Sequence, residues 1–193
     1  MIESFSYEHM ICVTNRHLCE EDFYERIEKI VQKKPKAIIL REKDLPEEEY
    51  EKMLFACKQI CEGKVPLYAH SFYHAARHAG IERIHFPLPM LRRYRLEHPE
   101  EKEFSGIGTS VHSVTEALEA QQLGASYVTA GHVFATDCKK GLPGRGISFL
   151  QEVCKAVSIP VYAIGGMKES NLNLMMKLGA AGSCMMSGFM QDK

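Results

Sequence analysis

The chain has 193 residues, enough to bury a sizeable core, and we expect a single domain over residues 1–193. Its net charge of −1 gives no basic face for nucleic acid, and 45% hydrophobic with 25% charged residues is ordinary for a globular protein. No apolar run is long enough to span a membrane, and the first ten residues carry no signal-peptide pattern. We therefore expect a cytoplasmic protein without nucleic-acid or membrane partners.

Short apolar runs alternate with helical patterns along most of the chain. Helix starts are marked by Pro46 with three glutamates after it, and by Ser113 with Glu116 three residues on. Glycines follow three of the helical patterns, at positions 80, 124 and 179. Residues 91–103 show no clear pattern. The expected strands are 10–15, 37–41, 66–70, 83–87, 104–110, 126–130, 160–166 and 182–188, and the expected helices include 23–31, 46–61, 73–80, 113–124, 148–157 and 169–179.

The strand runs are apolar throughout, which is typical of a parallel sheet buried on both faces. Eight strands alternating with helices predict an α/β protein with a (β/α)8 barrel, the TIM-barrel fold. The chain is short for that fold, and only residues 189–193 remain for the last helix, so we expect a compact barrel with a truncated final helix. A doubly wound open sheet is the alternative.

In such a barrel the loops after the strands form the active face. The glycines of Ala163–Met167 and Met185–Phe189 follow the last two strands, where backbone amides commonly bind phosphate. His132 follows the sixth strand within "GHVFATDCKKGLPGRG" and is the best candidate for proton transfer near neutral pH. Lys139 and Lys140 in that segment either close over the pocket or are ordinary surface residues.

A metal site is an alternative interpretation of three histidines spaced four apart, His70, His74 and His78. His70 ends a predicted strand, however, and only the other two lie on the following helix. No carboxylate is near them in the sequence. We therefore expect no metal ligands.

Motifs along nearly the whole chain resemble the thiamine phosphate synthase superfamily: "REK" at 41–43, "GTSVHSVTEA" at 108–117, "IPVYAIGG" at 159–166 and "MMSGF" at 185–189. The long motif containing His132, with "SIPVYAIGGM" after it, is similar to the TenI branch, the thiazole tautomerases. That resemblance implies a metal-independent isomerase without a cofactor, in which His132 carries the proton that makes a carboxythiazole phosphate aromatic.

The same resemblance implies how the ligand is held. Arg41 and Lys43 would face its carboxylate, because an arginine fork suits a carboxylate, and Ser110 would orient it. The phosphate would lie on the glycine turns. The implied phosphate-binding residues are Gly165, Gly166, Met186, Ser187 and Gly188.

Two other functions remain open. Thiamine phosphate synthase joins a pyrimidine pyrophosphate to a thiazole phosphate and uses magnesium, but Ser71 and a position near Met90 stand where the family has magnesium-binding aspartates, and Ile39 stands where it has a glutamine. We therefore expect the tautomerase rather than the synthase. The other alternative is a non-catalytic, regulatory protein that binds thiazole phosphate, which the presence of His132 disfavours. The sequence leaves the oligomeric state open, with a homodimer suggested only by analogy with the family.

Overall fold

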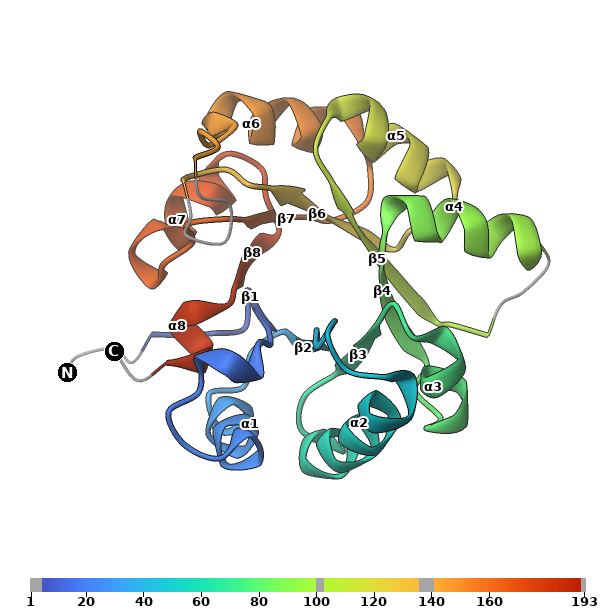
Figure 1. Cartoon of the computed structure of the whole chain (residues 1–193). Coiled ribbons are helices and arrows are strands. Elements are labelled where there is room, and N and C mark those ends of the chain that lie inside the picture. The colour runs from blue at the N-terminus through green and yellow to red at the C-terminus, as the bar shows by residue number, and fades with distance from the viewer. Residues whose placement is uncertain (1–4, 100–102, 136–140, 192–193) are drawn as a thin grey trace.

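The computed structural model describes residues 5–99, 103–135 and 141–191, and these form a closed barrel of eight parallel strands. Figure 1 shows the strands at the centre and the helices around them. The strands are β1 (Met10–Val13), β2 (Ala37–Leu40), β3 (Leu67–His70), β4 (Arg83–Pro87), β5 (Gly106–Val111), β6 (Tyr127–Gly131), β7 (Val161–Ile164) and β8 (Gly182–Met185).

Each strand leads into a helical segment. These are the short 3-10 helix η1 (Arg16–Leu18) followed by α1 (Phe23–Gln32), then α2 (Glu47–Cys61), α3 (Tyr73–His78), α4 (Leu88–Glu97), α5 (Val114–Gln122), α6 (Gly146–Ala156), α7 (Glu169–Lys177) and α8 (Ser187–Met190). The four residues of α8 confirm the truncated final helix.

Closure of the sheet distinguishes the barrel from the open-sheet alternative. β1 pairs with β2 on one side and with β8 on the other, through Ile11 opposite Ala37 and Ile11 opposite Cys184. The strands of an open sheet would leave two edges unpaired. The (β/α)8 prediction is therefore confirmed.

Local signals explain where several helices begin and end. The Ser113 hydroxyl accepts from the Glu116 backbone N–H at 3.1 Å, as a helix N-cap does. The Glu116 carboxylate accepts from the backbone N–H of His112 at 2.6 Å rather than from that of Ser113, so the capping box is displaced by one residue. The glycines at 80, 124 and 179 have φ of +62°, +77° and +101°, a left-handed conformation that ends a helix.

Helix α4 was not expected from the sequence. Its buried residues are Leu88, Leu91 and Tyr94, a stripe at spacing three. Between them stand two arginines and one proline, and Leu96 is 83% exposed, so the apolar pattern is obscured. The helix forms because that narrow stripe packs against β4 and β5.

Buried side chains form two clusters, as expected for strands covered on both faces. The larger one joins the strands to the helices. The smaller one fills the inside of the barrel and contains Ile11, Val13, Ala37, Ile39, Tyr127, Tyr162 and Cys184. This inner layer forms the base on which the polar end of the barrel rests.

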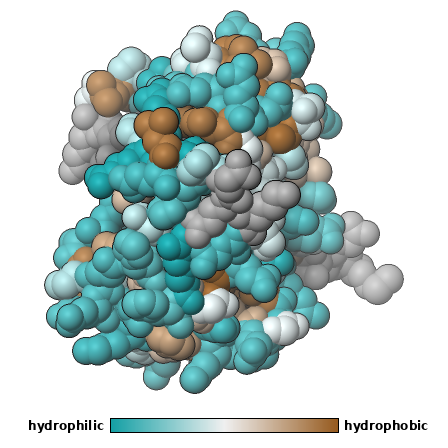
Figure 2. All heavy atoms as spheres, turned by 90° about the vertical axis from the view of Figure 1, so that its right-hand side faces the viewer, coloured by the Kyte–Doolittle hydropathy of each residue, from teal (hydrophilic) through white to brown (hydrophobic). Residues whose placement is uncertain are grey.

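The outer surface is ordinary for a folded protein. Figure 2 shows a mainly hydrophilic face with separate apolar areas. Among the helices of the described residues, none is both long enough and apolar enough to cross a membrane.

Candidate active site

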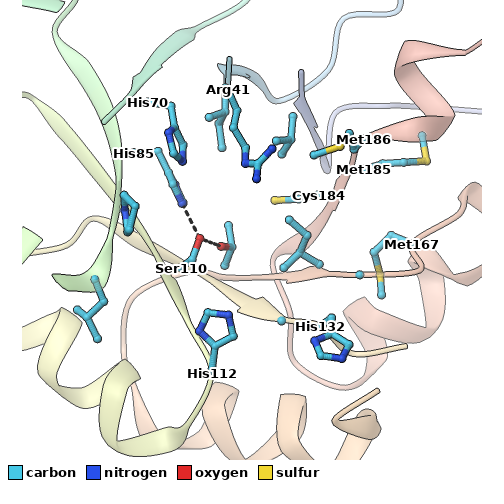
Figure 3. A pocket seen from close by; sticks show the side chains of 18 of the residues that line it. Arg41, His70, His85, Ser110, His112, His132, Met167, Cys184, Met185 and Met186 are labelled. Carbon is cyan, nitrogen blue, oxygen red and sulfur yellow. Dashed lines mark hydrogen bonds between the residues drawn. The ribbon is translucent and has the colours of Figure 1, made fainter. Parts of the chain in front are cut away.

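A cavity of about 540 Å³ opens at the carboxyl ends of the strands, a size typical of small-molecule sites. Figure 3 shows side chains from strands around the barrel pointing into it. The structure brings together eight of the nine residues expected from the sequence. They are Arg41, Lys43, Ser110, His132, Gly165, Gly166, Met186 and Ser187.

Gly188 does not line this cavity. It lies exposed in α8, and a Cβ on it would meet the Met185 Sδ at 2.4 Å. Its small size serves the packing of the helix. Lys139 and Lys140, expected either to close over the pocket or to be ordinary surface residues, lie outside the described residues.

His132 is buried, with 6% of its surface exposed, and it lines the cavity. Its Nε2 lies 3.0 Å from the Pro143 carbonyl oxygen. Because a carbonyl only accepts, Nε2 carries the proton and Nδ1 of the neutral ring is a bare acceptor. Within the described part of the chain Nδ1 is buried and has no hydrogen-bond partner.

The turn after β7 is held close to the segment after β6. Gly165 and Gly166 have φ of +97° and +67°, and a Cβ on Gly165 would lie 2.4 Å from the His132 Cβ. The Asn171 side chain donates to the Gly166 carbonyl at 3.2 Å and accepts from the Lys168 N–H at 3.0 Å. Asn171, which the sequence analysis did not single out, thus fixes the turn from the first residues of α7.

Backbone donors are available at this end of the barrel. No carbonyl of the described chain accepts from the N–H groups of Gly165, Gly166 or Ser187. Backbone amides that are free of internal partners suit phosphate oxygens. The arrangement therefore fits the anion site expected at β7 and β8.

A buried carboxylate, that of Glu42, positions the backbone that carries Arg41 and Lys43 at the end of β2. Glu42 is 2% exposed and accepts from the Thr14 hydroxyl at 2.7 Å and the Arg16 backbone N–H at 3.0 Å. The Arg41 N–H donates to that same Thr14 oxygen at 2.9 Å. Glu42 therefore ties the end of β1 to the end of β2 and holds the backbone between Arg41 and Lys43.

Two buried histidines form the floor next to these cations, and one of them, His85, was not singled out in the sequence. Its Nδ1 lies 3.0 Å from the Tyr127 hydroxyl and its Nε2 lies 2.9 Å from Ser110 Oγ, which also accepts from Thr129 at 3.0 Å. Figure 3 shows the chain from His85 through Ser110. Burial, followed by the charges of Lys43 and Arg41, lowers the pKa of His85 to about 3.

His70 stacks on His85 with ring centroids 5.7 Å apart and 18° between planes. Burial, the neighbouring His85 and then the charges of Lys43 and Arg41 hold the pKa of His70 well below its ordinary value. Both imidazoles are therefore neutral near pH 7. The floor of the cavity therefore carries no charge from these two rings, and both nitrogens of His85 are already engaged by Tyr127 and Ser110.

The three histidines considered as metal ligands do not converge. His70 is buried and its Nδ1 lies 2.9 Å from the Ser71 hydroxyl, while the His78 Nδ1 lies 3.3 Å from a Glu51 oxygen. Among the described residues no group of three or more histidine, cysteine or acidic side chains could hold a metal ion.

The family model described as thiamine monophosphate synthase matches residues 10–189. The chain belongs to this family. Thiamine-phosphate synthase from Fusobacterium nucleatum is 28% identical over 94% of this chain and 88% of that protein, and thiamine-phosphate synthase 2 from Streptococcus pneumoniae serotype 4 is 30% identical over 93% and 86%. The solved thiamine phosphate pyrophosphorylase from Pyrococcus furiosus has a TM-score of 0.81 at 25% identity and covers 98% of this chain and 91% of its own.

These relatives correct the function expected from the sequence. They carry the name of a synthase, a transferase, and not that of a tautomerase, so the prediction of a thiazole tautomerase and isomerase is wrong. That prediction rested on the resemblance of the motif around His132 to the TenI branch and on the missing magnesium-binding aspartates. A histidine acceptor in a cavity does not by itself define the reaction that takes place there.

The resemblance implies magnesium for the thiamine monophosphate synthase family, and the residues at the implied positions do not fit it. Ser71 bonds to His70, and Met90 offers only a thioether. Mg²⁺ prefers hard oxygen ligands, usually carboxylates. Among the described residues that line the cavity the one carboxylate is that of Glu116, which caps α5.

Proposed function

We propose that this chain is a transferase of the thiamine-phosphate synthase type, which joins a thiazole phosphate to a pyrimidine pyrophosphate in the cavity at the end of the barrel. The names of the similar proteins support this reaction. The substrates would be small molecules, each carrying an anionic group.

The observation that carries the proposal is that one cavity has two separate places for anions. The free amides after β7 and β8 form one of them. Arg41 and Lys43, after β2, form the other. A condensation of two anionic substrates needs two such places, one for each substrate.

The reaction defines what each part would do. The thiazole nitrogen attacks the methylene carbon of the pyrimidine, a C–N bond forms, and the C–O bond to pyrophosphate breaks with its electron pair leaving on oxygen. Positive charge from Arg41 and Lys43 stabilises the negative charge that develops on that oxygen. The amides of Gly165, Gly166 and Ser187 hold the thiazole phosphate, and His132 lines the cavity beside it.

The direct test is an assay with both substrates, measuring thiamine phosphate and pyrophosphate in equal amounts. Arg41→Gln should lower kcat/KM at least about tenfold, because a charge that stabilises the transition state is removed. Arg83→Gln is the matched control, since Arg83 is exposed at the opposite end of β4 and should leave the rate unchanged. Absence of product from the wild-type chain would contradict the proposed transferase.

A second candidate is a non-catalytic protein that binds thiazole phosphate. The lack of magnesium-type ligands beside Ser71 favours it, because the synthase reaction implied by the family uses that metal. Titration with thiazole phosphate alone separates the two functions. Binding without any turnover would support this candidate, and turnover would exclude it. A cytoplasmic location and a homodimer stay predictions for either function.

A further inference from the structure

The charges that line the cavity do not balance. The described lining residues carry three cations, Arg41, Lys43 and Arg92, against the carboxylate of Glu116. Arg92 is already paired with Glu119 through two bonds of 2.5 and 2.6 Å. Neither Arg41 nor Lys43 has a hydrogen bond or ion pair from its charged end within residues 5–99, 103–135 and 141–191. The cavity therefore keeps two uncompensated positive charges.

The charges of Arg41 and Lys43 act on a histidine of β3 and a histidine of β4. They contribute, after burial, to the lowered pKa values of both His70 and His85. The family resemblance puts the magnesium carboxylates at this same place, at Ser71 and near Met90. A divalent cation there would meet positive potential and, among the described residues at these positions, no carboxylate, so the local electrostatics oppose it.

The turn after β3 is built to present a hydrogen-bond donor instead. Ser71 has a left-handed φ of +69°, and its N–H donates to the His85 carbonyl at 3.1 Å. When the Ser71 hydroxyl donates to Nδ1 of His70, the neutral ring carries its proton on Nε2. Figure 3 shows the His70 ring and Arg41 beside the same part of the cavity.

We propose that this chain binds a pyrophosphate group without a divalent cation, held by Arg41, Lys43 and the Nε2–H of His70. The inference rests on the proposed function in one respect, because pyrophosphate is the leaving group of that reaction. A guanidinium binds two phosphate oxygens at once, and an ammonium adds a compact charge. Together they neutralise the group that magnesium otherwise neutralises.

Calorimetric titration of the full chain with inorganic pyrophosphate tests this directly. Binding in buffer with EDTA should be at least as tight as binding in buffer with Mg²⁺. Arg41→Gln should weaken the binding in EDTA by about tenfold or more, since one of the two uncompensated charges is lost. Binding that occurs only when Mg²⁺ is present would overturn the inference.

A pair of variants at Ser71 separates the effect of side-chain charge on pyrophosphate affinity from the effect of side-chain size. Asparagine and aspartate have the same size, and both tolerate a left-handed backbone. In EDTA, Ser71→Asp should bind pyrophosphate about tenfold more weakly than Ser71→Asn, and Mg²⁺ should narrow that difference because a carboxylate has been restored. Equal affinity of the two variants in EDTA would overturn the argument from charge.

Measuring turnover and pyrophosphate binding separately distinguishes failure of the proposed transferase from failure of this inference. Pyrophosphate binding in EDTA without formation of thiamine phosphate contradicts the proposed transferase and supports this inference. Turnover together with binding that requires Mg²⁺ contradicts this inference and supports the transferase.

Discussion

At the scale of single residues, His85 shows how burial keeps a titratable group neutral. It is 3% exposed, and both ring nitrogens already have partners, Tyr127 and Ser110. Protonation would add a charge in a poorly solvated place and would require one of these hydrogen bonds to reverse. The cavity floor therefore stays neutral over the pH range in which free histidine titrates.

This neutrality makes stability depend on pH. The pKa of His85 is about 3 in the folded chain, whereas that of an unfolded histidine is about 6.5. Below about pH 6.5 the unfolded chain takes up a proton that the folded chain does not, so the stability present above this pH is lost at about 1.4 kcal/mol per pH unit for this one group. His85→Gln, which cannot titrate, should show a shallower fall between pH 6.5 and 5.

Urea unfolding at a series of pH values measures these slopes. His74→Gln is the control, because His74 is exposed and its replacement should leave the slope as in the wild-type chain. Identical slopes for all three proteins would show that His85 is not the group responsible.

At the scale of elements, the sequence predicted those strands and helix ends that are marked by a pattern within the segment itself. Each of the eight strands was expected at about its observed position, because a buried parallel strand is apolar throughout. The helix-ending glycines were equally visible. Helix α4 was missed because its stripe of Leu88, Leu91 and Tyr94 is narrow and interrupted by arginines.

Site residues could be predicted where a general rule of the barrel fold locates them. They could not be predicted where they depend on contacts between residues far apart in the sequence. Loops after strands form the active face of a barrel, so Arg41 and His132 could be found. His85 could not, since its partners Ser110 and Tyr127 lie 25 and 42 positions away. Only the closed barrel brings these residues together.

The turn after β7 gives a prediction for one element. Asn171 bonds to the Gly166 carbonyl and to the Lys168 N–H, so Asn171→Ala removes two bonds that hold the anion-binding turn. Each such bond contributes about 0.5–1.5 kcal/mol, and the affinity for thiazole phosphate should fall about threefold to tenfold. Asn173→Ala on the exposed face of α7 is the matched control. Calorimetric titration checks both, and equal affinities would show that the turn holds its shape without Asn171.

At the scale of the whole molecule, the barrel depends on the seam between its first and last strands. The Ser183 N–H donates to the His9 carbonyl at 3.0 Å, and Cys184 is opposite Ile11. Strands joined around the barrel share one inner layer of side chains, so loosening this seam disturbs the cavity and the core together. Gly182 begins β8 and lies against the backbone of His9, just before β1.

Gly182→Ala should therefore destabilise the entire barrel. A Cβ at this position would lie 1.9 Å from the His9 carbonyl oxygen, and backbone cannot move aside as a flexible side chain can. We expect a loss of about 1–3 kcal/mol in the free energy of unfolding, as for other overpacked sites. Gly106→Ala is the control, because it also begins a strand, β5, but the nearest atoms to its Cβ would be the Tyr68 hydroxyl at 3.2 Å and the Arg83 Cγ at 3.4 Å, both on flexible side chains. Urea unfolding followed by circular dichroism measures both, and a Gly182→Ala protein as stable as Gly106→Ala would show that the seam can yield at this position without cost to the barrel.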